Sequence, residues 1–192
     1  GDRIVAGTYG AAAVAAGGEV LLRGICPSDL KVPLEEFQKA GAAVEADEKN
    51  RQIRIRMGKR PLPLLIKTEP YPGFPTDLQS PFMAFLATAQ GTSYIEEQVF
   101  EGRFATAKIL EQMGAVIRTE DQRAVIQGHY PLKGAAVNAC DLRGGAALMV
   151  AALAAEGDTF IGECHHIERG YEDICRDMAA LGAHIRWVGK DS

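Results

Sequence analysis

Hydrophobic and polar positions follow the same order three times along this chain. Each time, an alanine-rich apolar run ends at a glycine and leads to a strand-like run, an amphipathic run, a second glycine and another strand-like run. The apolar runs with their glycines read AAAVAAGG, FMAFLATAQG and LMVAALAAEG. Such self-similarity predicts one domain, residues 1–192, made of three copies of one unit at about 1–60, 61–130 and 131–192.

Each unit is predicted to contain two helices of different character. The first, near residues 10–16, 79–89 and 144–155, carries almost no charge on any side, which is typical of a helix enclosed in a core. The second is amphipathic, and in the third unit its apolar positions are Tyr171, Ile174, Met178 and Leu181. Glycines that fit a left-handed helix C-cap follow the second helices, at Gly41, Gly114 and Gly182.

Short runs with alternating or β-branched residues predict strands around these helices. They are Glu19–Arg23, Gln52–Met57, Ser93–Glu97, Ala115–Thr119, Ala124–Gln127 and Ala183–Val188. The predicted fold is therefore of the α/β (α+β) class: an inside-out α/β barrel of three βαβαββ repeats, with apolar helices at the centre and small sheets outside. The first repeat lacks a clear opening strand and the third lacks closing strands, so we expect strands from sequence outside this chain to complete the domain.

Composition narrows the possible functions. The chain has 192 residues, 24% of them charged, and a net charge of −4, which argues against a general nucleic-acid binder. No run approaches 18 consecutive apolar residues, so no membrane span is expected. The start at Gly1, without an initiator Met or a leader, is interpreted as that of a fragment.

The four cysteines form no CxxC pair, which favours reduced, structural thiols in a cytoplasmic protein. Adjacent His165 and His166 point to different faces of a helix or strand and have no accompanying ligand motif, so no metal site is expected. Phosphate-binding loops of the GxxxxGK[ST] and GxGxxG types are absent from the sequence.

Charged residues that occur in only some repeats are candidates for function, because the unit folds without them. Arg103 and Arg169 occupy the predicted starts of second helices, where the first repeat has Leu30. Asp77 and Asp141 precede the apolar helices. Arg143 follows the second of them.

Two interpretations of these residues stay open. The aspartates could be ordinary helix N-caps and the arginines surface ion-pair partners of little energetic weight. Cations are disfavoured at helix N-termini, however, so several arginines there favour an anion bound between them, gripped by guanidinium groups and backbone N–H groups. In that hypothesis Asp77 is the nearby carboxylate that no arginine obviously neutralises.

Several segments resemble the enolpyruvyl (1-carboxyvinyl) transferases that act on UDP-N-acetylglucosamine. The most specific is PYPGFPTDLQ at residues 70–79. The similarity continues through VFEGRF at 99–104, DLR at 141–143 and HIERGYE at 166–172, and Asp2-Arg3-Ile4 resembles the crossing between that family's two domains. The resemblance covers essentially the whole chain in order.

This resemblance implies a domain of three βαβαββ units that helps transfer the enolpyruvyl group of phosphoenolpyruvate to the 3′-hydroxyl of UDP-N-acetylglucosamine, without a cofactor. It implies that Asp77 is the general base and that Val99 contacts the nucleotide sugar. Arg103, Arg143 and Arg169 would hold phosphoenolpyruvate, with Arg169 counted as catalytic. Asp141, Asp2 and Arg3 complete the implied substrate-binding set.

The chain also departs from the family. None of its four cysteines aligns with the family's catalytic cysteine, and the Lys-Asn pair that contacts phosphoenolpyruvate is absent. The resemblance therefore implies the C-terminal half of a two-domain enzyme, inactive without its N-terminal partner domain. Two alternatives stay open: a non-catalytic binding or scaffold module with this fold, and a transferase for another acceptor.

Overall fold

The structure is a computed structural model that describes residues 1–189. In the first repeat, helix α1 (Arg3–Ala16) leads into strand β1 (Glu19–Arg23), and a 3₁₀ turn η1 (Pro27–Leu30) continues into α2 (Lys31–Lys39). Strands β2 (Ala43–Asp47) and β3 (Gln52–Arg56) follow. The three strands form an antiparallel sheet in the order β1-β3-β2.

The second repeat contains every element of the predicted unit. Its elements are β4 (Leu65–Lys67), η2 (Thr76–Leu78), α3 (Gln79–Leu86), β5 (Thr92–Glu96), α4 (Ala105–Gln112), β6 (Val116–Glu120) and β7 (Arg123–Gln127). The sheet order is β4-β5-β7-β6, with β4 parallel to β5 and the other pairs antiparallel. The prediction of a βαβαββ unit is confirmed here.

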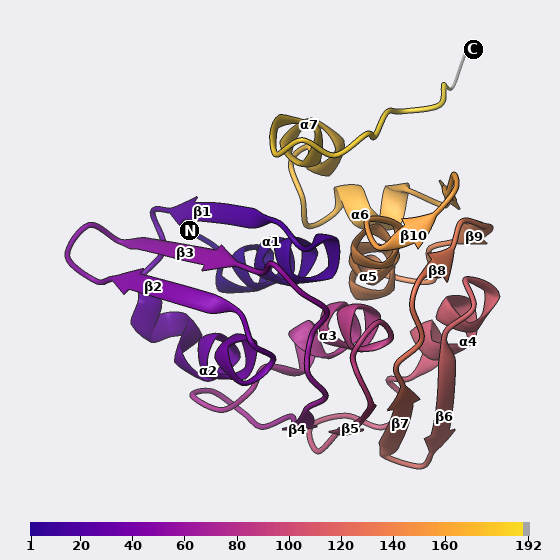
Figure 1. Cartoon of the computed structure of the whole chain (residues 1–192), viewed down its shortest axis with the longest axis horizontal. Coiled ribbons are helices and arrows are strands. Elements are labelled where there is room, and N and C mark those ends of the chain that lie inside the picture. The colour runs from indigo at the N-terminus through magenta and orange to yellow at the C-terminus, as the bar shows by residue number, and fades with distance from the viewer. Residues whose placement is uncertain (190–192) are drawn as a thin grey trace.

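The third repeat is built from shorter pieces. They are β8 (Leu132–Lys133), β9 (Ala136–Asn138), α5 (Leu142–Ala152), β10 (Ala155–Glu156), β11 (Phe160–Gly162), α6 (His165–Glu168) and α7 (Ile174–Ala180). Parallel pairs β8–β10 and β9–β11 replace a larger sheet. Helix α7 lies at one edge of the molecule (Figure 1).

Three apolar helices, α1, α3 and α5, occupy the centre, with the small sheets and the amphipathic helices around them (Figure 1). All of α3 is buried, and so is most of α1 and α5. An aromatic cluster ties α3 to its neighbours: the Phe82 ring stacks on Phe37 of α2 at 4.7 Å between centroids and meets Phe74 edge-on at 4.8 Å. The predicted arrangement of helices inside and sheets outside is confirmed, although the strands of residues 1–189 form separate sheets and do not close a barrel.

Two local predictions about the third repeat are wrong. Ala183–Val188 forms no strand, because no following strand in the described chain offers a hydrogen-bonding edge as β3 and β7 do for β2 and β6. Trp187 and Val188 are exposed there. The second helix begins only at Ile174, so Tyr171 packs from the loop before it, and Leu181 is exposed beyond its end.

Candidate functional site

Asp77 lies at the centre of a three-residue charged cluster. Its Oδ1 accepts a hydrogen bond from Nη1 of Arg103 at 3.0 Å, and its Oδ2 accepts one from Nη2 of Arg143 at 3.1 Å. All three side chains are about one-quarter to one-third exposed. The expectation that no arginine neutralises Asp77 is therefore wrong: two arginines pair with it.

The contacts of Asp77 exclude the helix-cap interpretation for this residue. Asp77 sits inside the turn η2, and its carboxylate bonds to guanidinium groups instead of capping backbone N–H groups. Burial raises the pKa of the Asp77 carboxyl, but the hydrogen bond from Arg103 and the charge of Arg143 outweigh burial, so the pKa lies below its ordinary value. Asp77 is thus an ionised, half-buried carboxylate held by two cations.

The cluster forms where the N-terminal ends of the central helices converge. Arg143 is in the first turn of α5, Asp77 immediately precedes α3, and Arg103 lies just before α4. Gly7 in α1 packs so closely on Leu78 that any larger side chain would overlap it. Unsatisfied N–H groups at helix N-termini add positive potential to that of the arginines, so the site is suited to an anion.

The buried hydroxyls of Thr8 and Tyr171 extend the site toward α1. The two oxygens are 2.8 Å apart, and the Arg143 guanidinium lies next to the Tyr171 hydroxyl. Burial raises the pKa of Tyr171 although Thr8 and Arg143 oppose it. The sequence analysis missed Thr8, whose only signal is a hydroxyl within an otherwise apolar run.

Asp2 and Arg3, predicted to lie near substrate, have contacts within the chain. Asp2 is the N-cap of α1, and its Oδ1 accepts hydrogen bonds from the backbone N–H groups of Ile4 at 2.7 Å and Val5 at 3.1 Å. The Arg3 guanidinium lies over the ring of Tyr71 at 4.8 Å. Arg3 thereby fastens the PYPGFP loop, which ends two residues before Asp77, to the start of α1.

Asp141 fits one of its two sequence interpretations, whereas the helix position predicted for Arg169 is wrong. Asp141 is the N-cap of α5, with its Oδ1 2.7 Å from the N–H of Gly144, so the capping interpretation is correct for this residue. Arg169 ends the short helix α6, five residues before α7, and does not stand at a helix start. Among residues 1–189 its exposed side chain makes no ion pair or hydrogen bond.

Val99, predicted to contact a nucleotide sugar, belongs to a loop fixed by a buried carboxylate. The N–H of Val99 donates to Oε1 of Glu97 at 3.0 Å, which leaves the peptide carbonyl to meet a ligand. Glu97 is 1% exposed and was missed by the sequence analysis. Its signal was the strand alternation, which puts Glu97 on the same buried face as Ser93 and Ile95.

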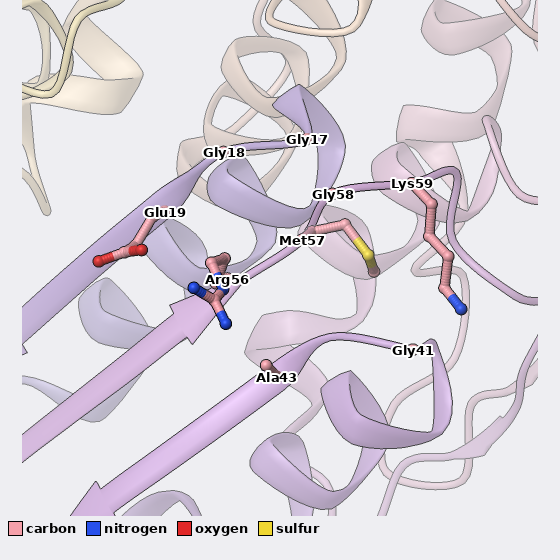
Figure 2. Close-up of a pocket in the computed structure, with 9 residues that line it drawn as sticks. All are labelled: Gly17, Gly18, Glu19, Gly41, Ala43, Arg56, Met57, Gly58 and Lys59. Carbon is pink, nitrogen blue, oxygen red and sulfur yellow. The ribbon is translucent and has the colours of Figure 1, made fainter.

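A hollow of about 580 Å³ lies beside sheet β1-β3-β2. Figure 2 shows it between Gly17 and Gly18 at the end of α1, Gly41, and the side chains of Arg56 and Lys59. Helix α1 separates it from Asp2 and Arg3 by about 20 Å, at 1.5 Å per residue. None of the predicted site residues lines this hollow.

Between residues 1 and 189, no group of three His, Cys, Asp or Glu side chains is arranged to hold a metal ion. No helix in that range is both long and apolar enough to span a membrane.

The structure combines a fold of repeated units, with helices inside, and an ionised carboxylate paired with two arginines near helix N-termini. Residues 1–178 match the profile of the family EPSP synthase (3-phosphoshikimate 1-carboxyvinyltransferase). The chain belongs to this family of enolpyruvyl transferases.

Similar proteins place the chain more narrowly within the family. It is 47% identical over 96% of its length to the UDP-N-acetylglucosamine 1-carboxyvinyltransferase of Desulfofundulus thermocisternus, of which it covers 75%. It is 46% identical over 97% of its length to the UDP-N-acetylglucosamine 1-carboxyvinyltransferase 2 of Carboxydothermus hydrogenoformans, of which it covers 45%. The chain thus spans less than half of that relative.

Comparison with solved structures supports the same fold. The enolpyruvyl transferase NikO from Streptomyces tendae superposes with a TM-score of 0.85 at 30% identity, over 96% of this chain and 44% of that one. An EPSP synthase from Acinetobacter baumannii gives 0.65 at 21% identity, over 84% of this chain and 39% of that one, which supports the fold.

Proposed function

We propose that this chain contributes part of the active site of a UDP-N-acetylglucosamine 1-carboxyvinyltransferase. That enzyme would move the enolpyruvyl group of phosphoenolpyruvate to the 3′-hydroxyl of UDP-N-acetylglucosamine and release phosphate, a step of peptidoglycan synthesis. The observation that carries the proposal is the Asp77–Arg103–Arg143 cluster at the converging helix N-termini. It is supported by the names of relatives that are 46–47% identical.

In this proposal the arginines hold the carboxylate and phosphate of phosphoenolpyruvate. Guanidinium groups stay protonated and can bind two oxygens of a carboxylate or a phosphate at once. Their present partner, Asp77, shows that a carboxylate fits between them. Arg169 has no ion-pair or hydrogen-bond partner among the described side chains. It joins Arg103 and Arg143 when substrate binding closes a second domain over the site.

Asp77 is the proposed general base for the 3′-hydroxyl. Its lowered pKa makes it a weak base while both arginines contact it. When phosphoenolpyruvate draws the guanidinium groups away, the carboxylate loses two compensating charges and becomes more basic. Asp77 then takes the hydroxyl proton as the hydroxyl oxygen bonds to C2 of phosphoenolpyruvate, and an acid of the second domain protonates C3. The surrounding cations stabilise the charged tetrahedral intermediate. Loss of a proton from C3 restores the double bond as phosphate leaves.

The remaining predicted residues take supporting roles. The Val99 carbonyl contacts the nucleotide sugar, because its N–H is already bound. Asp141, Asp2 and Arg3 act at the helix ends that frame the site. No cofactor or metal is used.

A second domain of the same polypeptide completes the proposed site. It would supply the catalytic cysteine, because none of this chain's cysteines lies in the Asp77 cluster. Cys26 and Cys164 directly precede η1 and α6, Cys175 lies in α7, and Cys140 contacts Asp141. The proposal includes a cytoplasmic location for the complete enzyme.

The test is the identity of the product. The full-length protein that contains this chain is incubated with phosphoenolpyruvate and either UDP-N-acetylglucosamine or 3-phosphoshikimate, and products are read by mass spectrometry. We expect an enolpyruvyl adduct of the sugar nucleotide alone. An adduct of 3-phosphoshikimate alone would assign another acceptor, and no adduct with either would favour a non-catalytic binding module.

A further inference from the structure

Glu97 is a buried carboxylate that accepts four hydrogen bonds beside the site. Its Oε1 accepts from the Thr68 hydroxyl at 2.8 Å and from the backbone N–H groups of Val99 at 3.0 Å and Phe100 at 3.1 Å. Its Oε2 accepts from the Thr76 hydroxyl at 2.8 Å. The side chain thus joins the end of β4, the turn that carries Asp77 and the loop after β5.

One of these bonds leads directly to an arginine of the cluster. The Thr76 hydroxyl donates its single proton to Glu97, so its oxygen is free to accept from Nη1 of Arg103, 3.3 Å away. The same Nη1 donates to Asp77. Glu97 therefore fixes the direction in which Thr76 presents a lone pair to the guanidinium.

A second connection reaches the same guanidinium from its other side. The Phe100 ring lies 4.7 Å from the Arg103 guanidinium carbon. The Phe100 backbone N–H is bound to Glu97 Oε1, which sets where the loop carries that ring. Arg103 is consequently held by Thr76 and Phe100, and both are held by Glu97.

We propose that Glu97 is a positioning residue that orients Arg103 through Thr76 and Phe100 and fixes the backbone at Val99. Glu97 is too deeply buried to contact substrate itself. The inference deepens the proposed function, on which its kinetic part rests.

The negative charge is essential to this role. A glutamine has the same shape but offers one acceptor oxygen and one NH₂ donor. Whichever way the amide turns, at least one donor loses its acceptor, and an amide N–H aimed at Thr76 competes with Arg103 for the hydroxyl oxygen. Glu97→Gln should therefore loosen Arg103 even where the fold is kept.

The experiment compares Glu97→Gln with Thr76→Val, a smaller change on the same path, and with their double variant. Glu36→Gln is the matched control, because Glu36 is also a buried glutamate but pairs with Lys39 on α2. In the ligand-free full-length protein, NMR follows the Arg103 side-chain Nε–H signal. In the full-length protein, KM for phosphoenolpyruvate, kcat and the unfolding midpoint are measured.

We expect Glu97→Gln and Thr76→Val each to broaden or shift the Arg103 signal and to raise KM for phosphoenolpyruvate about tenfold, the effect of one charge-assisted hydrogen bond. The double variant should raise KM by much less than the product of the two, because both act on one path. Glu36→Gln should lower only the unfolding midpoint.

An unchanged Arg103 signal in a folded Glu97→Gln chain would overturn the proposal. So would KM effects that multiply in the double variant, or a KM change in Glu36→Gln equal to that in Glu97→Gln. If the wild-type full-length protein has no turnover, the proposed function fails, while the Arg103 signal still decides the role of Glu97.

Discussion

The charge of Asp77 makes the stability of the fold depend on pH. Asp77 has a folded-state pKa below its ordinary value of about 3.9 because two arginines bind its ionised form. A depressed pKa means that the ion pairs stabilise the fold above the unfolded-state pKa. Their contribution is lost as pH falls through the folded-state value.

Asp77→Asn should therefore be less stable than wild type at neutral pH, since Asn cannot ionise and leaves Arg103 and Arg143 without a charged partner. The gap between their unfolding midpoints should narrow as pH falls below about 4, because the unfolded-state carboxyl is protonated there first, and should close once pH passes the lower folded-state pKa. Thermal unfolding at pH 7, 5, 4 and 3 measures it. A gap that stays constant across this range would show that the two ion pairs do not stabilise the fold.

Arg103→Lys tests the guanidinium geometry. A lysine carries the same charge but has no planar group. It therefore cannot contact Thr76 and Asp77 and stack on the Phe100 ring at the same time. We expect KM for phosphoenolpyruvate to rise about tenfold or more in the full-length protein. Arg123→Lys is the control, because Arg123 forms an exposed pair with Glu96. Equal effects of the two substitutions would contradict the assignment.

The site residues that could be predicted from the sequence are those that differ between the repeats. Asp77, Arg103 and Arg143 stood out because the unit does not need them to fold, and the structure brings them together. Glu97 and Thr8 could not be recognised, because their roles depend on contacts across the chain: Glu97 with Thr68 and Thr76, and Thr8 with Tyr171.

At the scale of elements, close packing of central helices positions the site. Gly7 of α1 contacts the fully buried Leu78, the neighbour of Asp77. A methyl group at Gly7 would overlap the Leu78 side chain, which has no free space to move into.

Gly7→Ala should destabilise the fold although alanine favours helices. Overpacking costs about 1–3 kcal/mol, against a gain of about 1 kcal/mol from helix propensity. The unfolding midpoint should fall by several degrees, at about 2–4 °C per kcal/mol for a chain of this size. Gly18→Ala, where a methyl group meets open space, should change it little. A midpoint unchanged or raised in Gly7→Ala would show that Leu78 can give way.

Most elements could be predicted because their signals are local. The apolar runs became buried helices, and the alternating runs of the first two repeats became paired strands. Ala183–Val188 has the same alternation but no strand beside it in residues 1–189. Strand formation depends on a hydrogen-bonding partner, and sequence alone does not show whether one is available.

At the scale of the whole molecule, the chain spans 44% of the NikO structure and 45% of its relative in Carboxydothermus hydrogenoformans. The cluster here supplies the proposed base and cations, and in the described residues no cysteine lies in it. We therefore expect turnover only when a second domain closes over Asp77, Arg103 and Arg143. That the chain is a single domain, completed by another half, stays a prediction.

The central claim is that Asp77 serves enolpyruvyl transfer. Its most direct test is phosphate release from phosphoenolpyruvate by the full-length protein, with and without UDP-N-acetylglucosamine, for wild type and Asp77→Asn. We predict release that requires the sugar nucleotide and falls at least about a hundredfold in Asp77→Asn, the scale of one general base. Near-wild-type release by a folded Asp77→Asn protein would contradict the account.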